Sequence, residues 1–83
     1  MDNISQQIIK LAQKYSKVNR PVTLESDLVV DLELDSLSLT ELIVDCEDEF
    51  GIEIDMDHPD TKNAKTLKDL YDGIVMLINL RAS

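Results

Sequence analysis

The chain has 83 residues, of which 17 are acidic and 8 are basic, and its formal net charge at pH 7 is −9. A chain this short predicts one domain, residues 1–83, with a single modest core and little room for a deep enzyme cleft. No apolar run reaches the roughly 18 residues of a membrane span, no signal peptide is recognisable, and the negative charge argues against nucleic acid or anionic membrane as a partner.

The cysteine and histidine content excludes an intrachain disulfide and a typical zinc site. Cys46 is the only cysteine, so an intrachain disulfide is impossible, and we expect a cytoplasmic protein. One Cys and one His cannot supply the four usual ligands of zinc, and no calcium-loop spacing is present, so we expect no dedicated metal site. Weak cation binding stays open at the acidic residues, which are Asp31, Glu33, Asp35, Glu47, Glu49, Glu53, Asp55, Asp57 and Asp60.

The acidic residues are concentrated in the middle of the chain. Fourteen of the seventeen lie between Glu25 and Asp60, and residues 21–61 contain no Lys or Arg. Such a segment is attracted to proteins with basic patches. The alternative is that these acids only keep a small protein soluble.

The first predicted helix covers about residues 3–18. Asn3 and Gln6 have the spacing of a capping box, and Pro21 ends the pattern. Apolar residues recur on one face, which we expect to be buried: Ile4, Ile8, Leu11 and Tyr15.

Residues 21–35 show no sustained helical period and predict a long acidic loop. A loop of this length is unusual in a small domain unless it has a function. We expect its scattered leucines to attach it to the core. Apolar residues alternate with polar ones within residues 28–34, as they do in a strand, but no second convincing strand exists to pair with this segment.

The second predicted helix begins after Asp35, which is a suitable N-cap, and ends at Gly51. Its predicted core face consists of Leu39, Leu42, Ile43, Cys46 and Phe50. The opposite face consists of Leu37, Glu41, Val44, Asp45 and Asp48. Apolar residues set among acids indicate a docking strip, although isolated exposed apolar residues are also common on surfaces.

Two further helices complete the prediction. Pro59 could begin a short helix near residues 57–63, and Thr66 with Asp69 forms a capping-box pattern before a helix that runs to about Leu80. The last helix has its apolar stripe at Leu67, Leu70, Ile74 and Ile78. The sequence therefore predicts an all-α fold, a small four-helix bundle of three longer helices and one short helix with a long first loop.

Ser36 lies in the first turn of the second predicted helix. Backbone N–H groups and the helix dipole favour an anion there by about 0.3–1 kcal/mol, which suits an attached phosphoester. Direct catalysis by Ser36 would need a base, and the only imidazole is His58, in a polar loop with no oxyanion-hole motif. We therefore expect that Ser36 is not the nucleophile of a Ser-His hydrolase.

The segments Asp31-Leu32-Glu33-Leu34-Asp35-Ser36-Leu37 and Glu47-Asp48-Glu49-Phe50-Gly51-Ile52-Glu53-Ile54 closely resemble the acyl carrier proteins. The resemblance covers essentially the whole chain. We expect a monomer. The resemblance implies a carrier that is not itself an enzyme, in which a phosphopantetheinyl transferase attaches 4′-phosphopantetheine from coenzyme A to Ser36, and in which Asp35, the helix cap, takes part in transferase recognition. The arm would carry acyl groups as thioesters to synthase and acyl-transferring enzymes with basic docking patches, in fatty acid, polyketide or related lipid synthesis.

The resemblance also implies roles for two sets of residues. The partner-docking set is Leu37, Glu41, Val44, Asp45, Glu47 and Asp48. The acyl-pocket set is Leu39, Leu42, Ile43, Cys46, Ile54, Leu67 and Ile74, for which an ordinary core role is the alternative.

Four positions depart from the family pattern. Glu33 stands where glycine is common, Ser38 where an acid is usual, Cys46 where leucine is common, and Asp55 where proline is frequent. These departures favour a specialised carrier over the housekeeping one. Two other interpretations remain open, an acidic adaptor of the same fold without the arm and an aminoacyl or peptidyl carrier.

Overall fold

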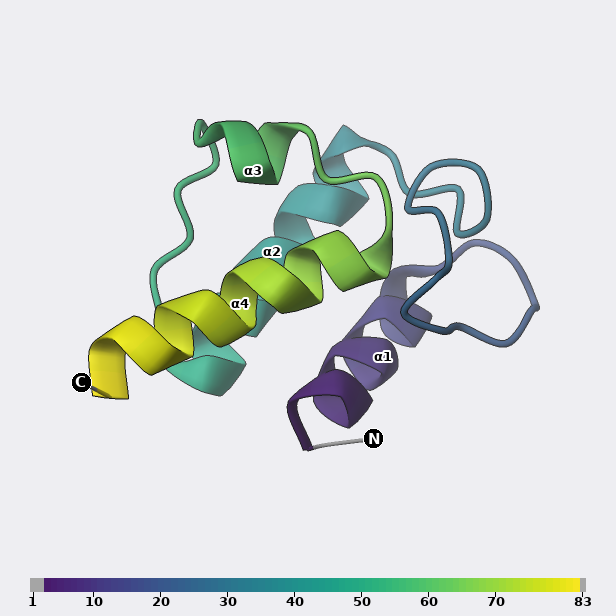
Figure 1. Ribbon diagram of the computed structural model, residues 1–83. Helices are drawn as coiled ribbons and strands as arrows, with labels where there is room; N and C mark the ends of the chain where they lie inside the picture. Colours follow the sequence, from purple (N-terminus) through teal and green to yellow (C-terminus); the bar gives the residue numbers. More distant parts are fainter. Residues whose placement is uncertain (1–2, 83) are drawn as a thin grey trace.

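A computed structural model describes residues 3–82 and has the helix order α1 (Asn3–Tyr15), α2 (Ser36–Phe50), α3 (Pro59–Lys62) and α4 (Leu67–Ala82). Three helices are long, and α3 is a single helical turn. Helix α1 packs against both α2 and α4, and α3 packs against α4 (Figure 1). Within residues 3–82 the only strand-like pairing is an isolated bridge between Asp27 and Thr66. The all-helical architecture predicted from the sequence is therefore confirmed.

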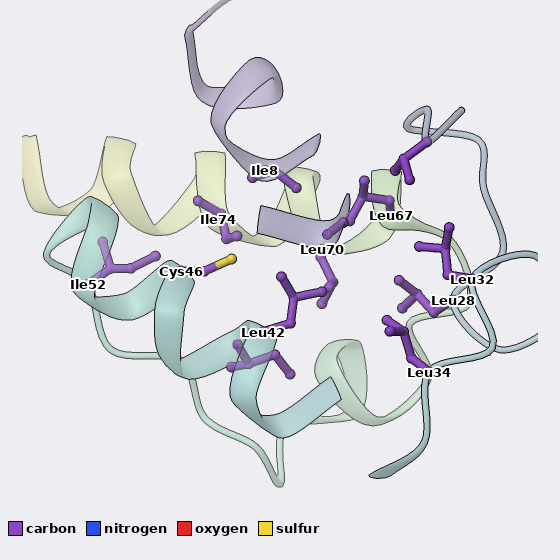
Figure 2. Packing of buried hydrophobic residues seen from close by; sticks show 13 residues of the cluster. Ile8, Leu28, Leu32, Leu34, Leu42, Cys46, Ile52, Leu67, Leu70 and Ile74 are labelled. Carbon is purple, nitrogen blue, oxygen red and sulfur yellow. The ribbon is translucent and has the colours of Figure 1, made fainter. Parts of the chain in front are cut away.

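The core gathers side chains from the three long helices and from the first loop (Figure 2). Helix α1 contributes Ile8 and Ala12, which are fully buried together with Ser5. The predicted stripe residues Ile4, Leu11 and Tyr15 are half-buried at the edges of this contact. The core face of α2 is as predicted, with three members buried and Leu39 and Phe50 packed at its margin.

Helix α1 ends at Tyr15, three residues before the predicted end. The Ser16 N–H still donates to the Ala12 carbonyl, but the Ser16 hydroxyl then bonds the backbone of Val18, which competes with further helix. The Lys17 N–H donates to the Leu32 carbonyl (3.1 Å) instead of to a helical partner. Asn3, the predicted cap, is helical and is the first described residue of α1.

The first loop is a series of turns and not a strand. The Asp27 carboxylate accepts the N–H groups of Val29 and Val30 (2.9 and 2.8 Å), and Asp31 in turn accepts the Asp27 N–H (2.7 Å). These turns expose both valines. The leucines of the same segment point the other way, into the core, as expected: Leu28, Leu32 and Leu34.

The loop is also fastened to the start of α4. The Leu28 N–H donates to the Lys65 carbonyl (2.8 Å), and the N–H groups of Leu67 and Lys68 donate back to loop carbonyls (3.0 and 2.7 Å). Segments far apart in sequence are thus joined by backbone hydrogen bonds. The loop that precedes α2 therefore has a fixed position relative to α4.

The predicted ends of α2 and the predicted start of α4 are confirmed, while α4 continues to Ala82, beyond its predicted end at about Leu80. The Asp35 side chain caps α2, and Gly51 ends it in a left-handed conformation with φ of 62°. Thr66 and Asp69 form a reciprocal capping box, since the Asp69 N–H donates to the Thr66 hydroxyl and the Thr66 N–H donates to the Asp69 carboxylate (3.4 and 3.0 Å). None of the described helices is both long enough and apolar enough to cross a membrane.

Glu33 has φ of 53°, the only positive φ of a non-glycine residue among those described. Its N–H donates to the Val29 carbonyl (3.1 Å) at the end of the turns just described, which fixes this backbone conformation. Side chains with a β-carbon are strained there. The position that the family commonly fills with glycine therefore does require a left-handed residue, and Glu33 occupies it under strain.

We expect Glu33→Gly to raise the free energy of unfolding, measured in urea, by about 0.5–1 kcal/mol. A residue with a β-carbon costs about 1–2 kcal/mol in the left-handed conformation, and glycine removes this cost. Glycine also loses more conformational entropy on folding, which costs about 0.5–1 kcal/mol, so the first effect should be the larger. Glu33→Ala is the matched control, because it removes the carboxylate but keeps the β-carbon. An equal gain in both variants would contradict the backbone explanation.

Candidate functional site

Ser36 is the first residue of α2 and is exposed. Asp35, the preceding residue, has extended backbone, and its carboxylate accepts the Ser38 N–H (2.7 Å). This bond fixes the start of the helix. The Ser36 carbonyl accepts the Thr40 hydroxyl (2.8 Å), so the backbone of Ser36 is held within the first turn while its hydroxyl lies at the surface.

A lysine from outside the acidic segment lies next to this helix start. The Lys17 ammonium donates to the second oxygen of the Asp35 carboxylate at 2.6 Å, and the Lys17 backbone is held by Leu32. The Lys17 ammonium and the Ser38 N–H hold the pKa of Asp35 well below its usual range. Both ends of this ion pair are about half exposed, so it contributes little to stability. It keeps Asp35 ionised and in place beside Ser36.

The outer face of α2 presents apolar side chains among acids, as predicted. Leu37 is 68 % exposed and Val44 is 46 % exposed, and Glu41 and Asp48 are exposed as well. We call these four residues, Leu37, Glu41, Val44 and Asp48, the α2 outer face. An apolar centre with charged surroundings is typical of a protein-binding surface.

Two acids of the predicted docking set are instead bound within the fold. The half-buried Asp45 carboxylate accepts the Tyr15 hydroxyl and pairs with the Lys14 ammonium (3.3 Å), which ties α2 to α1. The Tyr15 hydroxyl and, to a smaller extent, Lys14 lower the pKa of Asp45. The Glu47 carboxylate accepts the Ile54 N–H (2.8 Å), and so fastens the segment after α2.

The predicted acyl-pocket residues do not form one cavity. Five of them are no more than 2 % exposed and belong to the packed core, namely Leu42, Ile43, Cys46, Leu67 and Ile74 (Figure 2). Leu39 and Ile54 are half-buried. A cleft of about 150 Å³ lies instead between α3, α4 and residues 53–55, and only Ile54 and Ile74 of the predicted set line it.

Several residues that line the cleft are not in the predicted acyl-pocket set, and one of them is a glycine. Gly73 lines it from the interior of α4, alongside the apolar residues Leu70 and Leu77. Glycine in a helix interior is unfavourable, so its presence there was the available signal. Among residues 3–82 no group of three or more His, Cys, Asp or Glu side chains is placed to hold a metal ion.

Comparison with known proteins gives one consistent family. The family described as "Phosphopantetheine attachment site" matches residues 6–74. "Acyl carrier protein 3, mitochondrial" of Arabidopsis thaliana is 46% identical over 65 residues, which cover 77% of this chain but only 47% of that protein. "Acyl carrier protein" of Buchnera aphidicola subsp. Baizongia pistaciae is 39% identical over 75 residues, covering 89% of this chain and 94% of that one.

A solved structure agrees with these sequence matches. A Mycobacterium tuberculosis protein assigned as an acyl carrier protein has a TM-score of 0.77 and 36% sequence identity to this chain. The match covers 88% of this chain and 96% of that one. The likeness therefore extends over nearly the whole of both folds.

Cys46 has no exposed surface and faces Ile74 in the core (Figure 2). Burial, and then the negative charges of Asp45, Glu47 and Glu49, raise the pKa of its thiol to about 12. The thiolate is the reactive form. At pH 8 only about one Cys46 side chain in ten thousand would be in the thiolate form.

We expect the native protein without any attached group to be inert toward a chromogenic disulfide reagent at pH 8. After unfolding in guanidinium chloride, the same sample should react with one equivalent, because the thiol is then solvated and its pKa returns toward its usual value. The unfolded sample is the control for reagent and protein concentration. A rapid reaction of one equivalent in the native state would contradict the burial of Cys46.

Proposed function

Because this chain belongs to the acyl carrier protein family, we propose that it carries acyl intermediates as thioesters on a 4′-phosphopantetheine arm attached to Ser36. The protein is a carrier and not an enzyme, and the attachment domain of the family holds this prosthetic group covalently. When bound, the group supplies a thiol for the thioester. The observation that carries the assignment to Ser36 is its exposed position as the first residue of α2, directly after the Asp35 cap.

The residues around Ser36 are suited to such a group. An attached phosphodiester would stand at the N-terminus of α2, where unpaired N–H groups and the helix dipole favour negative charge. The Ser36 side chain is at the surface, so an arm could extend without displacing packed residues. Asp35 fixes the first turn through Ser38, and Lys17 places a positive charge beside it.

We assign partner docking to the α2 outer face. The partners in this proposal are a phosphopantetheinyl transferase and the acyl-transferring and synthase enzymes of fatty acid or related lipid or polyketide synthesis, each with a basic patch. Leu37 and Val44 would supply the apolar contacts, and Glu41 and Asp48 would supply the charges that guide association. Asp45 and Glu47 would act through the fold, because their carboxylates are already bound to α1 and to residue 54.

The remaining parts of the proposal concern the oligomeric state, the number of helices in the bundle and the cellular compartment. We propose that the protein is a monomer, that α3 is the short fourth helix of the bundle, and that the carrier works in the cytoplasm. The curated Arabidopsis relative carries the word mitochondrial in its name, so the compartment needs its own test. Localisation of a fluorescent fusion in the source cell would provide it.

Incubation with coenzyme A and a broad-specificity phosphopantetheinyl transferase should add the mass of one phosphopantetheine. Mass spectrometry of the intact protein measures this gain directly. Ser36→Ala should abolish it, while Ser38→Ala, which removes a neighbouring hydroxyl, should not. No gain in the unmodified chain, or a gain that survives Ser36→Ala, would overturn the assignment of Ser36.

Charge reversal on the α2 outer face should slow arm transfer. We expect Glu41→Lys or Asp48→Lys to lower kcat/KM of the transferase about tenfold at low salt, with a smaller effect at high salt, because guiding charges act mainly on association. Asp72→Lys is the matched control, since Asp72 is an exposed acid on α4 that pairs with Lys68. Equal rates for all three variants and the unmodified chain would exclude this face from docking.

A further inference from the structure

The early end of α1 brings Lys17 to the start of α2. The Ser16 hydroxyl bonds the backbone two residues further on, and the Lys17 N–H donates to the Leu32 carbonyl (3.1 Å) instead of continuing the helix. Leu32 is 1 % exposed, so the backbone of Lys17 is attached to a fixed part of the core. From this position the Lys17 ammonium reaches the Asp35 carboxylate at 2.6 Å.

The stability of the fold does not explain this ion pair. The side chains of Lys17 and Asp35 are 49 % and 58 % exposed, and pairs at such exposure contribute little. The cap of α2 does not require the lysine either, because the capping bond from the Ser38 N–H goes to the other oxygen of the Asp35 carboxylate (2.7 Å). The fixed position of Lys17 therefore calls for another explanation.

The charges at Ser36 provide one. Ser36 follows Asp35 directly, and the Cα atoms of consecutive residues are about 3.8 Å apart. A phosphodiester on the Ser36 hydroxyl would put a second negative charge beside the Asp35 carboxylate, and like charges this close repel each other. Residues 21–61 contain no Lys or Arg, so a cation for this pair of anions has to come from a flanking segment.

The Lys17 ammonium has the capacity to bind a second anion. An ammonium group has three N–H donors on a flexible stem. One of them bonds Asp35, and the ammonium has no other bonding partner among the residues that the structure describes. Because the side chain is half exposed, its remaining donors are open to solvent. Lys17 could therefore bond a second anion without releasing the first.

We propose that Lys17 bridges the Asp35 carboxylate and the phosphodiester of the arm on Ser36, and is thus the counter-ion of the attached group. The inference rests on the proposed function. It makes Lys17 a positioning residue, which holds the attached end of the arm beside α2 and leaves the remainder of the arm free to move.

The test measures the midpoint of thermal unfolding for the unmodified chain and for Lys17→Met, each with and without the arm. Without the arm, the substitution should lower the midpoint by no more than about 2 °C, as expected for an exposed pair. With the arm, the loss should be larger by about 3 °C or more, because two neighbouring anions then have no cation between them. Sodium chloride at about 1 M should remove most of this extra loss.

Lys14→Met is the matched control. Lys14 is also an exposed lysine that pairs with an acid of α2, since its ammonium lies 3.3 Å from the Asp45 carboxylate. Its substitution should cost the same with and without the arm. Lys17→Arg keeps the positive charge and should restore most of the midpoint of the arm-bearing protein. A purely structural role of Lys17 would give equal losses in both states.

A second measurement needs no substitution. Nitrogen-15 spectra of the lysine ammonium groups report the surroundings of each Nζ in the unmodified chain. The Lys17 signal should shift when the arm is attached, and the Lys14 signal should stay in place. This comparison also decides the matter if Lys17→Met cannot be loaded completely.

The outcomes separate this inference from the carrier assignment. Failure of Ser36 to accept any arm, as measured by mass spectrometry, overturns the proposed function and this inference with it. Complete loading combined with equal losses for Lys17→Met in the two states, or with an unmoved Lys17 signal, overturns the inference alone. An equal extra loss for Lys14→Met and Lys17→Met would also overturn it, because the effect would then be one of general charge.

Discussion

The attachment of the first loop to the start of α4 is the constraint on which the other features depend. Backbone hydrogen bonds join Leu28 to Lys65 and residues 67 and 68 to loop carbonyls, and the loop leucines enter the core from the same segment. A long loop is costly to order unless buried side chains and satisfied backbone groups offset the lost freedom. Here both do, so the chain reaches Asp35 in a fixed direction, and α2 begins where Lys17 can meet its cap.

The acidic character of the middle segment serves two purposes. Some carboxylates are internal connections: Asp27 and Asp31 shape the loop, Asp45 joins α2 to α1, and Glu47 holds residue 54. Others, such as Glu41 and Asp48, are exposed. The net charge therefore overstates the number of acids available to a partner. The acidic character of α2 and its cap also explains why the ammonium groups of Lys14 and Lys17 lie against this helix.

The parts of the fold that follow from local patterns could be predicted from the sequence. The Asp35 cap, the capping box of Thr66 and the Gly51 stop each depend on residues within a few positions. The end of α1 could not be predicted, because it depends on a bond from Lys17 to Leu32. The bound state of Asp45 depends likewise on Tyr15, which is 30 positions away. The cleft between α3 and α4 was only partly predicted, through Ile54 and Ile74, because periodicity identifies buried faces but gives no sign of where packing is incomplete.

The burial of Cys46 bears on how the protein behaves under oxidising conditions. The chain has no other cysteine, and this one has no exposed surface, so a thiol carried on an arm at Ser36 would find no thiol of its own chain to oxidise with. Oxidation would then join two molecules through their arms into a disulfide-linked dimer. That dimer would leave both folded domains intact and would be fully reversed by a reductant.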